Sequence, residues 1–598
     1  MVRDVCILDL QLFEEMKERL GDAVKNGTGD KERFHVYAWE AGIGKSTHVN
    51  DSIIEHYNNF AFEEGVKKFL IVKKFKSDVY ETVERLKSDS LLDMYGKNSI
   101  IGLTSENVKE YSVEDIKACM VLVITHQRYI EACSKELAAS FGERDTLIID
   151  EQLQFPIVKY GRAEYNDMRK DIHLYEGQVL FDKCFLPLLK KLDSIYKSGD
   201  YNNIVTFKDL FDKETLKDFK KWVKVNDNDF RKKKYKDIIE KIELLQKDES
   251  NGLIHNNALY LIDQSKKFRK LKNNIILDAS ADITPLYKLE KQFKLVENRL
   301  CIDHSKSNMA YMKVNTSKSS LKKNLEAVIK DIQNRLRNLN DSDKRALVVS
   351  HKENAKELNN ALKDNLKHGI YYPNEDGNEE VMSFKAATDW YGNIVGKNLY
   401  KDYDLCFIVG TNNMPLPIYL LQFCQYSTGT DFSKLPDKMA LEAGKFKIEK
   451  LETIRKAFVA SDFYQAARRI QRNQNPKATY ILYTFDEEVI EMFNSKFKNL
   501  MDIIELDNTS IVGTYPSALE EKAEKILKYI HDKYEVGEII LKKDVSEALG
   551  IPSTNLARCW KSKVIQNMVD RELIEIRHKE IVKKGAFEAD EQLVNASI

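Results

Sequence analysis

A glycine-rich segment near the amino terminus contains the residue types that bind phosphate groups. It lies between an expected strand over 34–38 and an expected helix, and its residues are Glu40, Ala41, Gly42, Ile43, Gly44, Lys45, Ser46 and Thr47. Backbone N–H groups at such a turn can surround phosphates, and the helix amino terminus adds partial positive charge. A lysine there neutralises the terminal phosphates, and a serine hydroxyl ligates Mg²⁺. The segment therefore predicts binding of ATP, with Mg²⁺ held by Ser46.

One position departs from the usual form of this motif, GxxxxGK[ST]. Trp39 stands where the first glycine is expected. Because Gly42 still supplies a flexible inner position, we interpret the segment as a variant phosphate-binding loop. The alternative is a turn that contains glycines by chance.

Two carboxylates follow a second apolar segment. Residues 147–149 are Leu-Ile-Ile, and Asp150 and Glu151 come directly after them, about 105 residues downstream of Lys45. A strand that ends in Asp-Glu is common, but in the same α/β unit as a phosphate-binding loop it predicts a hydrolytic site. Asp150 would hold Mg²⁺ through water, and Glu151 would polarise the attacking water.

An arginine-rich segment occurs much later in the chain. Gln465, Arg469 and Arg472 belong to the sequence QAARRIQR over 465–472. In a helix, arginines at this spacing fall on one face, from which they can reach a γ-phosphate as arginine fingers. The alternative is a solvated basic helix.

The elements that must position these residues alternate between strand and helix. Short runs of Val, Ile, Leu and Phe recur at 34–38, 69–72, 120–125, 146–149 and 275–277, and again at 345–350, 405–410 and 478–483. Strands that alternate with helices predict parallel sheets covered by helices. The fold class is therefore α/β, with two such units in tandem.

Between about 160 and 270 the strand pattern fades into charged helical sequence, which predicts a helical insertion in the first unit. Its most basic part is Phe230 to Lys236. This part is either a solvated helix face or a contact for nucleic acid.

The sequence after Pro516 predicts a winged helix. Helices are expected over 520–534, 543–549 and 554–569, followed by two strands over 573–578 and 581–587. The last helix carries Arg558, Lys561 and Lys563, which would contact nucleic acid if it is a recognition helix. Protein contacts or duplex splitting are the alternative roles.

Composition limits the remaining classes. Lys+Arg 94 and Asp+Glu 94 give the 598 residues a formal net charge of +0, so any contact with nucleic acid must come from local patches. The eight cysteines form no CxxC pair, so no zinc ribbon or closely spaced iron–sulfur ligand set is visible. With no signal peptide and no long apolar run, we expect a cytoplasmic protein without membrane contact.

The order of these motifs resembles superfamily 2 helicases and translocases. These enzymes contain a phosphate-binding loop, an Asp-Glu box, a small-residue motif and a QxxGRxxR box, in this order. Here Asp278-Ala279-Ser280-Ala281-Asp282 is similar to the third, and 465–472 to the last, with Arg468 in place of glycine. The segment 392–398 (GNIVGKN) is similar to the motif before the arginine box. The segment 124–129 (ITHQRY) resembles the DinG type of helicase of bacteria, plasmids and phages.

The resemblance implies two RecA-like domains, over 1–288 and 289–505, with the winged helix over 516–598. It implies that ATP is hydrolysed in the cleft between the two RecA-like domains, which moves the protein along nucleic acid or unwinds it. Gly396 would contact the nucleotide. Ser280, His126 and Asn398 would contact nucleic acid or couple the two sites.

The implied partner is DNA rather than RNA, together with proteins of replication, repair or defence. An RNA helicase stays open as an alternative. From another class, so does a nucleotide-switched regulator that binds DNA through the winged helix, although an arginine box in a second α/β unit speaks against it. A nuclease or packaging motor lacks a visible further carboxylate cluster.

Overall fold

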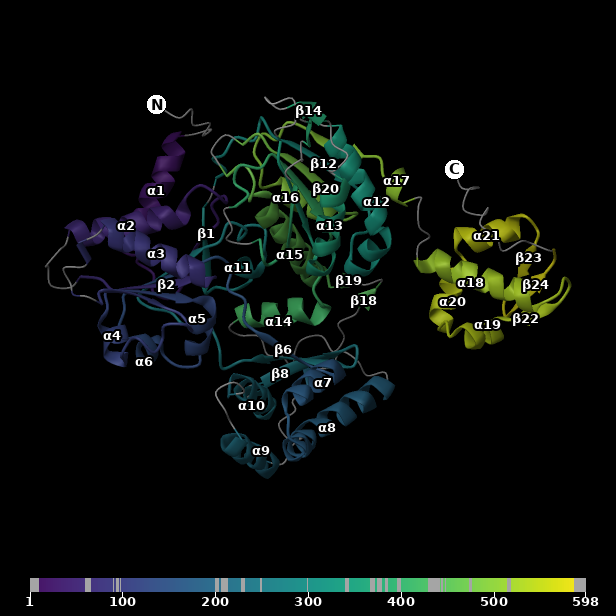
Figure 1. Cartoon of the computed structure of the whole chain (residues 1–598), viewed down its shortest axis with the longest axis horizontal. Coiled ribbons are helices and arrows are strands. Elements are labelled where there is room, and N and C mark those ends of the chain that lie inside the picture. The colour runs from purple at the N-terminus through teal and green to yellow at the C-terminus, as the bar shows by residue number, and fades with distance from the viewer. Residues whose placement is uncertain are drawn as a thin grey trace. The chain divides into compact units, whose positions relative to one another are not determined.

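In the computed structural model of the chain, the described residues are 10–59, 66–89, 91–92, 96, 98–198, 204–205, 213–226, 232–247, 250–297, 299–338, 344–365, 371–373, 379–381, 386–394, 399–427, 441–442, 445–446, 448–472, 476–512 and 518–585. The chain divides into two compact units. The first comprises residues 1–318 and 340–505, and the second comprises residues 319–339 and 506–598. Figure 1 labels the elements of both.

Within the described residues, seven parallel strands form the first sheet, in the order β11-β1-β10-β5-β2-β4-β3. Their bounds are β1 (Phe34–Tyr37), β2 (Phe69–Lys73), β3 (Ile100–Leu103), β4 (Val121–Thr125), β5 (Thr146–Asp150), β10 (Asn273–Leu277) and β11 (Phe293–Val296). Alternate residues of β2, such as Leu70 and Ile71, enter the cores on opposite faces of the sheet. Burial on both faces explains why these strands are continuous apolar runs. The five strands predicted here are confirmed, whereas β3 and β11 were not predicted.

Helices cover both faces of this sheet. Residues of α1 (Leu10–Lys25), α2 (Lys45–Asn59) and α3 (Lys76–Asp89) share one core. The core of the other face includes residues of α4 (Val113–Ala118), α5 (His126–Ala132), α6 (Leu137–Phe141) and α11 (Leu286–Leu289). Because α2 begins at Lys45, directly after Gly44, the glycine-rich loop lies at a helix amino terminus.

The segment between β5 and β10 contains both helices and strands. Its elements are β6 (Ile157–Tyr160), α7 (Arg162–Asp171), α8 (Tyr175–Ser198), β7 (Ile204–Val205), α9 (Lys213–Asn226), α10 (Lys232–Gln246), β8 (Ser250–His255) and β9 (Ala258–Asp263). The strands form an antiparallel sheet, and the helices lie together on one side of it (Figure 1). The hairpin of β8 and β9 was not predicted, although Asn256 and Asn257 form a two-residue turn with positive φ at both positions.

The second sheet has six strands among the described residues, in the order β16-β13-β17-β20-β12-β21. They are β12 (Asn308–Met312), β13 (Ala346–Ser350), β16 (Ala386–Trp390), β17 (Leu405–Val409), β20 (Thr479–Tyr483) and β21 (Ile503–Leu506). The helices between these strands in the chain are α12 (Lys318–Arg337), α13 (Lys352–Asn365), α14 (Leu416–Tyr426), α15 (Glu449–Ala467) and α16 (Glu487–Asn494). Two short antiparallel strand pairs also occur here: β14 (Tyr371–Pro373) pairs with β15 (Glu379–Val381), and β18 (Leu441–Glu442) pairs with β19 (Lys445–Phe446). The three strands predicted for this sheet are confirmed.

Helix α14 packs against the antiparallel sheet of the insertion, opposite its helices (Figure 1). The Gln422 side-chain amide donates to the carbonyl of Phe155 (3.0 Å), and the Tyr426 hydroxyl donates to the carbonyl of Leu153 (2.7 Å). This helix therefore joins the second α/β part to the first.

The carboxy-terminal segment contains α17 (Thr509–Val512), α18 (Ala518–Lys533), β22 (Ile539–Leu541), α19 (Lys542–Leu549), α20 (Ser553–Cys559), α21 (Lys563–Asp570), β23 (Ile574–Ile576) and β24 (Glu580–Lys583). Its strands form an antiparallel sheet in the order β22-β24-β23. The prediction of one helix over 554–569 is wrong. Helix α20 ends at Cys559, and a new helix, α21, begins at Lys563. The Ser562 side chain caps this new helix by accepting from the N–H of Ile565. No helix in the described part of the chain is long and apolar enough to span a bilayer.

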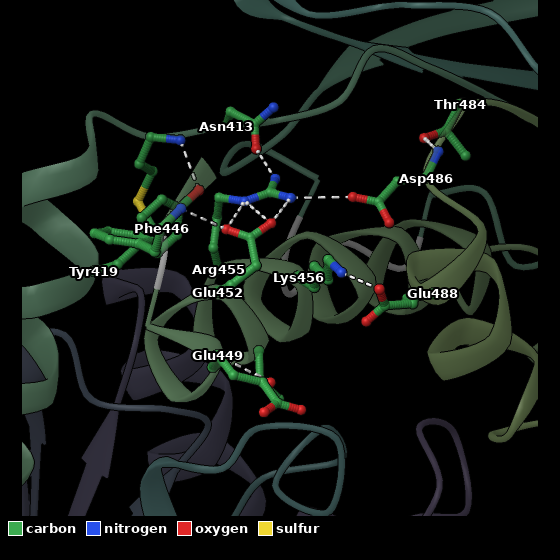
Figure 2. Close-up of polar contacts among 12 residues, drawn as sticks. Asn413, Tyr419, Phe446, Glu449, Glu452, Arg455, Lys456, Thr484, Asp486 and Glu488 are labelled. Atoms are coloured by element: carbon green, nitrogen blue, oxygen red, sulfur yellow. Dashed lines mark hydrogen bonds and ion pairs between the residues drawn. The ribbon is translucent and has the colours of Figure 1, made fainter. Parts of the chain in front are cut away.

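A buried ion-pair network fixes the amino-terminal half of α15 (Figure 2). The Arg455 guanidinium lies 2.6 Å from Glu452 Oε1 and 3.0 Å from Asp486 Oδ2, and it donates to Asn413 Oδ1 at 2.7 Å. Arg455, Glu452 and Asp486 are all buried. One cation therefore ties α15 to the loop after β17 and to the segment after β20.

We predict that Arg455→Met destabilises the protein by about 3–5 kcal/mol, since it leaves two buried carboxylates without their cation. The neighbouring Lys456 is the matched control, because it is as buried as Arg455 but its partner Glu488 is exposed and stays solvated without it. Lys456→Met should cost only about 0–1 kcal/mol. Chemical denaturation of the two variants measures the difference. Equal costs would contradict the role given to Arg455.

Candidate active site

A pocket of about 560 Å³ lies at the carboxyl ends of the first parallel sheet and is closed by residues from the second α/β part. Its lining includes six residues of the glycine-rich loop and the start of α2, namely Ala41, Gly42, Gly44, Lys45, Ser46 and Thr47. Lys73, Asp150 and Glu151 line it from the ends of β2 and β5. Gln465, Arg469 and Arg472 line it from the second part. The structure thus gathers the three predicted motifs around one cavity.

The loop has the backbone conformation that its glycines permit. Gly42 and Gly44 have φ values of +91° and +86°, in the region that favours glycine. The Lys45 ammonium donates to the carbonyls of Trp39 (2.6 Å) and Glu40 (3.1 Å), so it turns back over the loop. Trp39 itself is buried in the core and packs edge-on against Tyr37. The position of the missing glycine is therefore a core position in this chain.

Burial changes the chemistry of the Lys45 ammonium. Removal from water lowers the pKa of Lys45 to about 8, against the opposing attraction of Asp150. An anionic ligand in the pocket would favour the protonated form again.

Asp150 connects the loop with β2. Its Oδ2 atom accepts from the Ser46 hydroxyl at 2.9 Å and from the Lys73 ammonium at 2.8 Å. Burial raises the pKa of Asp150, but the charge of Lys73 and these hydrogen bonds outweigh burial and leave it below its usual value. Asp150 is therefore an anionic carboxylate beside a hydroxyl, which is a fitting pair of oxygen donors for Mg²⁺. In the described residues, no group of three or more His, Cys, Asp or Glu is placed to hold a metal ion.

Glu151 faces the pocket between two cations. Its φ of +70° is unusual for a residue other than glycine, and its backbone N–H donates to the carbonyl of Leu277 (2.8 Å). Its carboxylate lies 3.6 Å from Lys74 and 3.8 Å from Arg469. Burial raises its pKa above the usual value. A carboxylate with a raised pKa is a better proton acceptor for a water molecule.

The arginines do not lie on one helical face, so that prediction is wrong. Helix α15 ends at Ala467, and Gln471 has a φ of +43°, so the chain turns directly after the helix. Arg469 folds back and donates to the carbonyl (3.2 Å) and the side-chain Oε1 (3.0 Å) of Gln465. Burial and the neighbouring Arg469 lower the pKa of Arg472 to about 10, which leaves it protonated at neutral pH.

The backbone of Ala41 is bonded to Tyr464 of α15 and to Arg468, the residue directly after this helix. Its N–H donates to the Tyr464 hydroxyl (2.9 Å), and its carbonyl accepts from Arg468 Nη2 (3.0 Å). Arg468 is fully buried. The residue that replaces glycine in the arginine box therefore holds the phosphate-binding loop.

Some of the predicted side chains point away from the pocket. Glu40 is buried, and its Oε2 atom accepts from the N–H groups of Cys301 (2.6 Å) and Ile302 (3.1 Å), while Ile43 packs in the core. Only the backbone of these two loop residues remains available for phosphate binding.

The two predicted coupling residues of the first part are buried. Ser280 bonds to Asp278 through its N–H and its hydroxyl. His126 Nε2 contacts the carbonyl of Asp150 (2.8 Å), so it supports the carboxylate strand from behind. Beside them, Asp282 pairs with Lys496 of the second part at 2.7 Å.

Five further residues were predicted to contact the nucleotide or the nucleic acid. Gly396 and Asn398 lie outside the described residues. Arg558 is an exposed residue of α20, Lys561 lies between α20 and α21, and Lys563 begins α21.

Sequence reasoning missed Lys73, Tyr464 and Arg468. Lys73 directly follows a predicted strand, as Asp150 does, and this shared position is a signal that could have paired them. Tyr464 lies one residue before the arginine box and has no motif of its own.

No protein-family model and no curated protein matches this sequence. Solved structures nevertheless share its fold. XPD_APO is 13% identical, with a TM-score of 0.51, over 82% of this chain and 100% of that chain. XPD_Helicase is 14% identical, with a TM-score of 0.50, over 84% of this chain and 100% of that chain. The predicted resemblance to superfamily 2 helicases is thereby confirmed as a distant likeness of fold, with two α/β parts of RecA-like type.

We predict that nucleotide binding near pH 8 takes up a proton at Lys45. With a pKa of about 8 in the free protein, about half of the Lys45 side chains are neutral at that pH, whereas phosphate contact favours the ammonium. The affinity for ATP should be constant below pH 8 and should decrease above it. Titration calorimetry with ATP in two buffers of different ionisation enthalpy counts the protons.

The matched control is Lys45→Arg, which stays charged at every pH used. It also corrects for protons that the nucleotide itself exchanges. Equal proton uptake by both proteins would contradict the assignment to Lys45.

Proposed function

We propose that this chain is an ATP-dependent DNA helicase or translocase that hydrolyses ATP in the pocket between its two α/β parts. One observation carries the proposal. Arg469 and Arg472, from the second part, line the same cavity as Lys45, Asp150 and Glu151 from the first. A nucleotide held there would contact both parts at once, which a single-domain nucleotide switch does not require.

The residues have complementary roles in the proposed reaction. The loop N–H groups and Lys45 would hold the triphosphate, and Ser46 and Asp150 would hold Mg²⁺, which would neutralise charge on the phosphates. Glu151 accepts a proton from the attacking water, because its raised pKa favours that transfer. Gln465 fixes Arg469, and the two arginines stabilise the charge that develops on the γ-phosphate.

Hydrolysis would be coupled to motion through contacts that cross between the two parts. Ala41 bonds to Tyr464 and Arg468, and Asp282 pairs with Lys496, so a change at the loop acts on the second part. If nucleotide and nucleic acid favour the same arrangement of the parts, each strengthens binding of the other.

We also propose the boundaries 1–288 and 289–505 for the two RecA-like domains, with a helical insertion over about 160–270, and a winged helix over 516–598. The helices α18 to α21 and the antiparallel sheet of β22, β23 and β24 support the last of these. A groove of about 1000 Å³ in this segment is lined by Lys542, Lys543, Lys561 and Lys584 and by two carboxylates, Glu572 and Glu575. Because lysines outnumber carboxylates, the groove favours a polyanion such as nucleic acid. The proposed location is the cytoplasm.

The proposal predicts that single-stranded DNA stimulates ATP hydrolysis by about tenfold, within the usual range of coupling between sites. The assay compares DNA, RNA and no nucleic acid. Stronger stimulation by RNA would favour an RNA helicase. ATP hydrolysis that responds to neither would exclude a motor.

Lys45→Ala is the control, since it should abolish hydrolysis while the chain stays folded. Strand displacement on duplexes with 3′ tails, 5′ tails or blunt ends then separates unwinding from translocation. If the protein binds a specific duplex sequence and displaces no strand, the result would favour the DNA-binding regulator instead.

A further inference from the structure

The end of strand β2 places a buried cation at the proposed metal site. Val72 pairs with Ile149 across the parallel strands β2 and β5, so the next residues, Lys73 and Asp150, come side by side. The Lys73 side chain is only 6% exposed, and its ammonium lies 2.8 Å from Asp150 Oδ2. A buried lysine with this partner is a fixed charge rather than a solvated surface group.

The same oxygen of Asp150 also accepts from Ser46. The two oxygen donors proposed for Mg²⁺ are therefore engaged with each other and with the Lys73 ammonium. The ammonium supplies to the carboxylate the positive charge that a metal ion would otherwise supply. It also lines the pocket beside Lys45, within reach of an anionic ligand there.

We propose that Lys73 is a positioning residue that holds the Asp150 carboxylate in the metal-free protein and thereby lets a nucleotide bind without a divalent cation. This inference rests on the proposed function. With a divalent cation on Asp150, the Lys73 ammonium would be released to the phosphates of the nucleotide, since it lines the same pocket. Without Lys73, the buried charge of Asp150 repels the phosphates, and binding depends on the metal.

Lys74 provides a matched control. It is the next residue and carries the same charge. Its ammonium lies 3.6 Å from the carboxylate of Glu151, but its side chain is 29% exposed. A general loss of positive charge near the pocket would affect Lys74→Met and Lys73→Met alike. A specific contact with Asp150 affects only Lys73→Met.

The test measures the dissociation constant of a fluorescent ADP analogue in Mg²⁺ and in EDTA. The ratio of the EDTA value to the Mg²⁺ value reports the dependence on metal. In Lys73→Met this ratio should rise at least about tenfold above that of the wild type, which is the effect of about 1.4 kcal/mol. In Lys74→Met it should stay within about threefold.

A second pair of variants covers the possibility that the bare Asp150 of Lys73→Met unfolds the protein. Asp150→Asn removes the charge that Lys73 holds, so the freed ammonium should tighten ADP binding in EDTA. Adding Lys73→Met to Asp150→Asn should then weaken binding in EDTA by at least about tenfold.

The outcomes separate the inference from the proposed function. Two results would overturn the role of Lys73 alone. One is that Lys73→Met binds ADP normally with an unchanged ratio of the EDTA value to the Mg²⁺ value. The other is that the double variant binds ADP in EDTA as tightly as Asp150→Asn does. No ADP binding by the wild type in either buffer would overturn the proposed function as well.

Discussion

The backbone of Ala41 links the phosphate-binding loop to the second α/β part, and the geometry of the site depends on it. The Tyr464 hydroxyl of α15 accepts from its N–H, and Arg468, directly after α15, donates to its carbonyl, so both backbone polar groups of this residue are held. At the other end of the same helix, Arg455 fixes α15 to its own part through two buried carboxylates. The loop and the arginines after α15 are therefore held by one helix, and a movement of either part changes the pocket.

The pocket itself is a balance of buried charges. Lys45, Lys73, Arg469 and Arg472 oppose Asp150 and Glu151, and all of them line the cavity. Burial disfavours the charged forms of two of them, as the lowered pKa of Lys45 and the raised pKa of Glu151 show. A nucleotide with its metal ion brings negative and positive charge into the pocket. The cations and the carboxylates of the pocket can then exchange partners with it.

The sequence alone predicted the central strands and the three motifs, because buried parallel strands are continuous apolar runs and the motifs follow them directly. It did not predict edge strands such as β3, which is four residues long, or the hairpin of β8 and β9 within charged sequence. The end of α15 at Ala467 was missed because RRIQR has no glycine or proline to mark it. The position of Lys73 after a strand hints at its contact with Asp150, but the contact also requires β2 and β5 to be neighbours. The contact of Arg468 depends on the second part, which no local pattern encodes.

The most direct test of a shared site is single-turnover ATP hydrolysis by Arg472→Ala, with the affinity for ATP measured on the same protein. If the second part completes the site, hydrolysis should fall by about a thousandfold, the usual worth of an arginine finger, while ATP affinity changes by only a few-fold. Hydrolysis at the wild-type rate would show that the first part acts alone and would contradict the account.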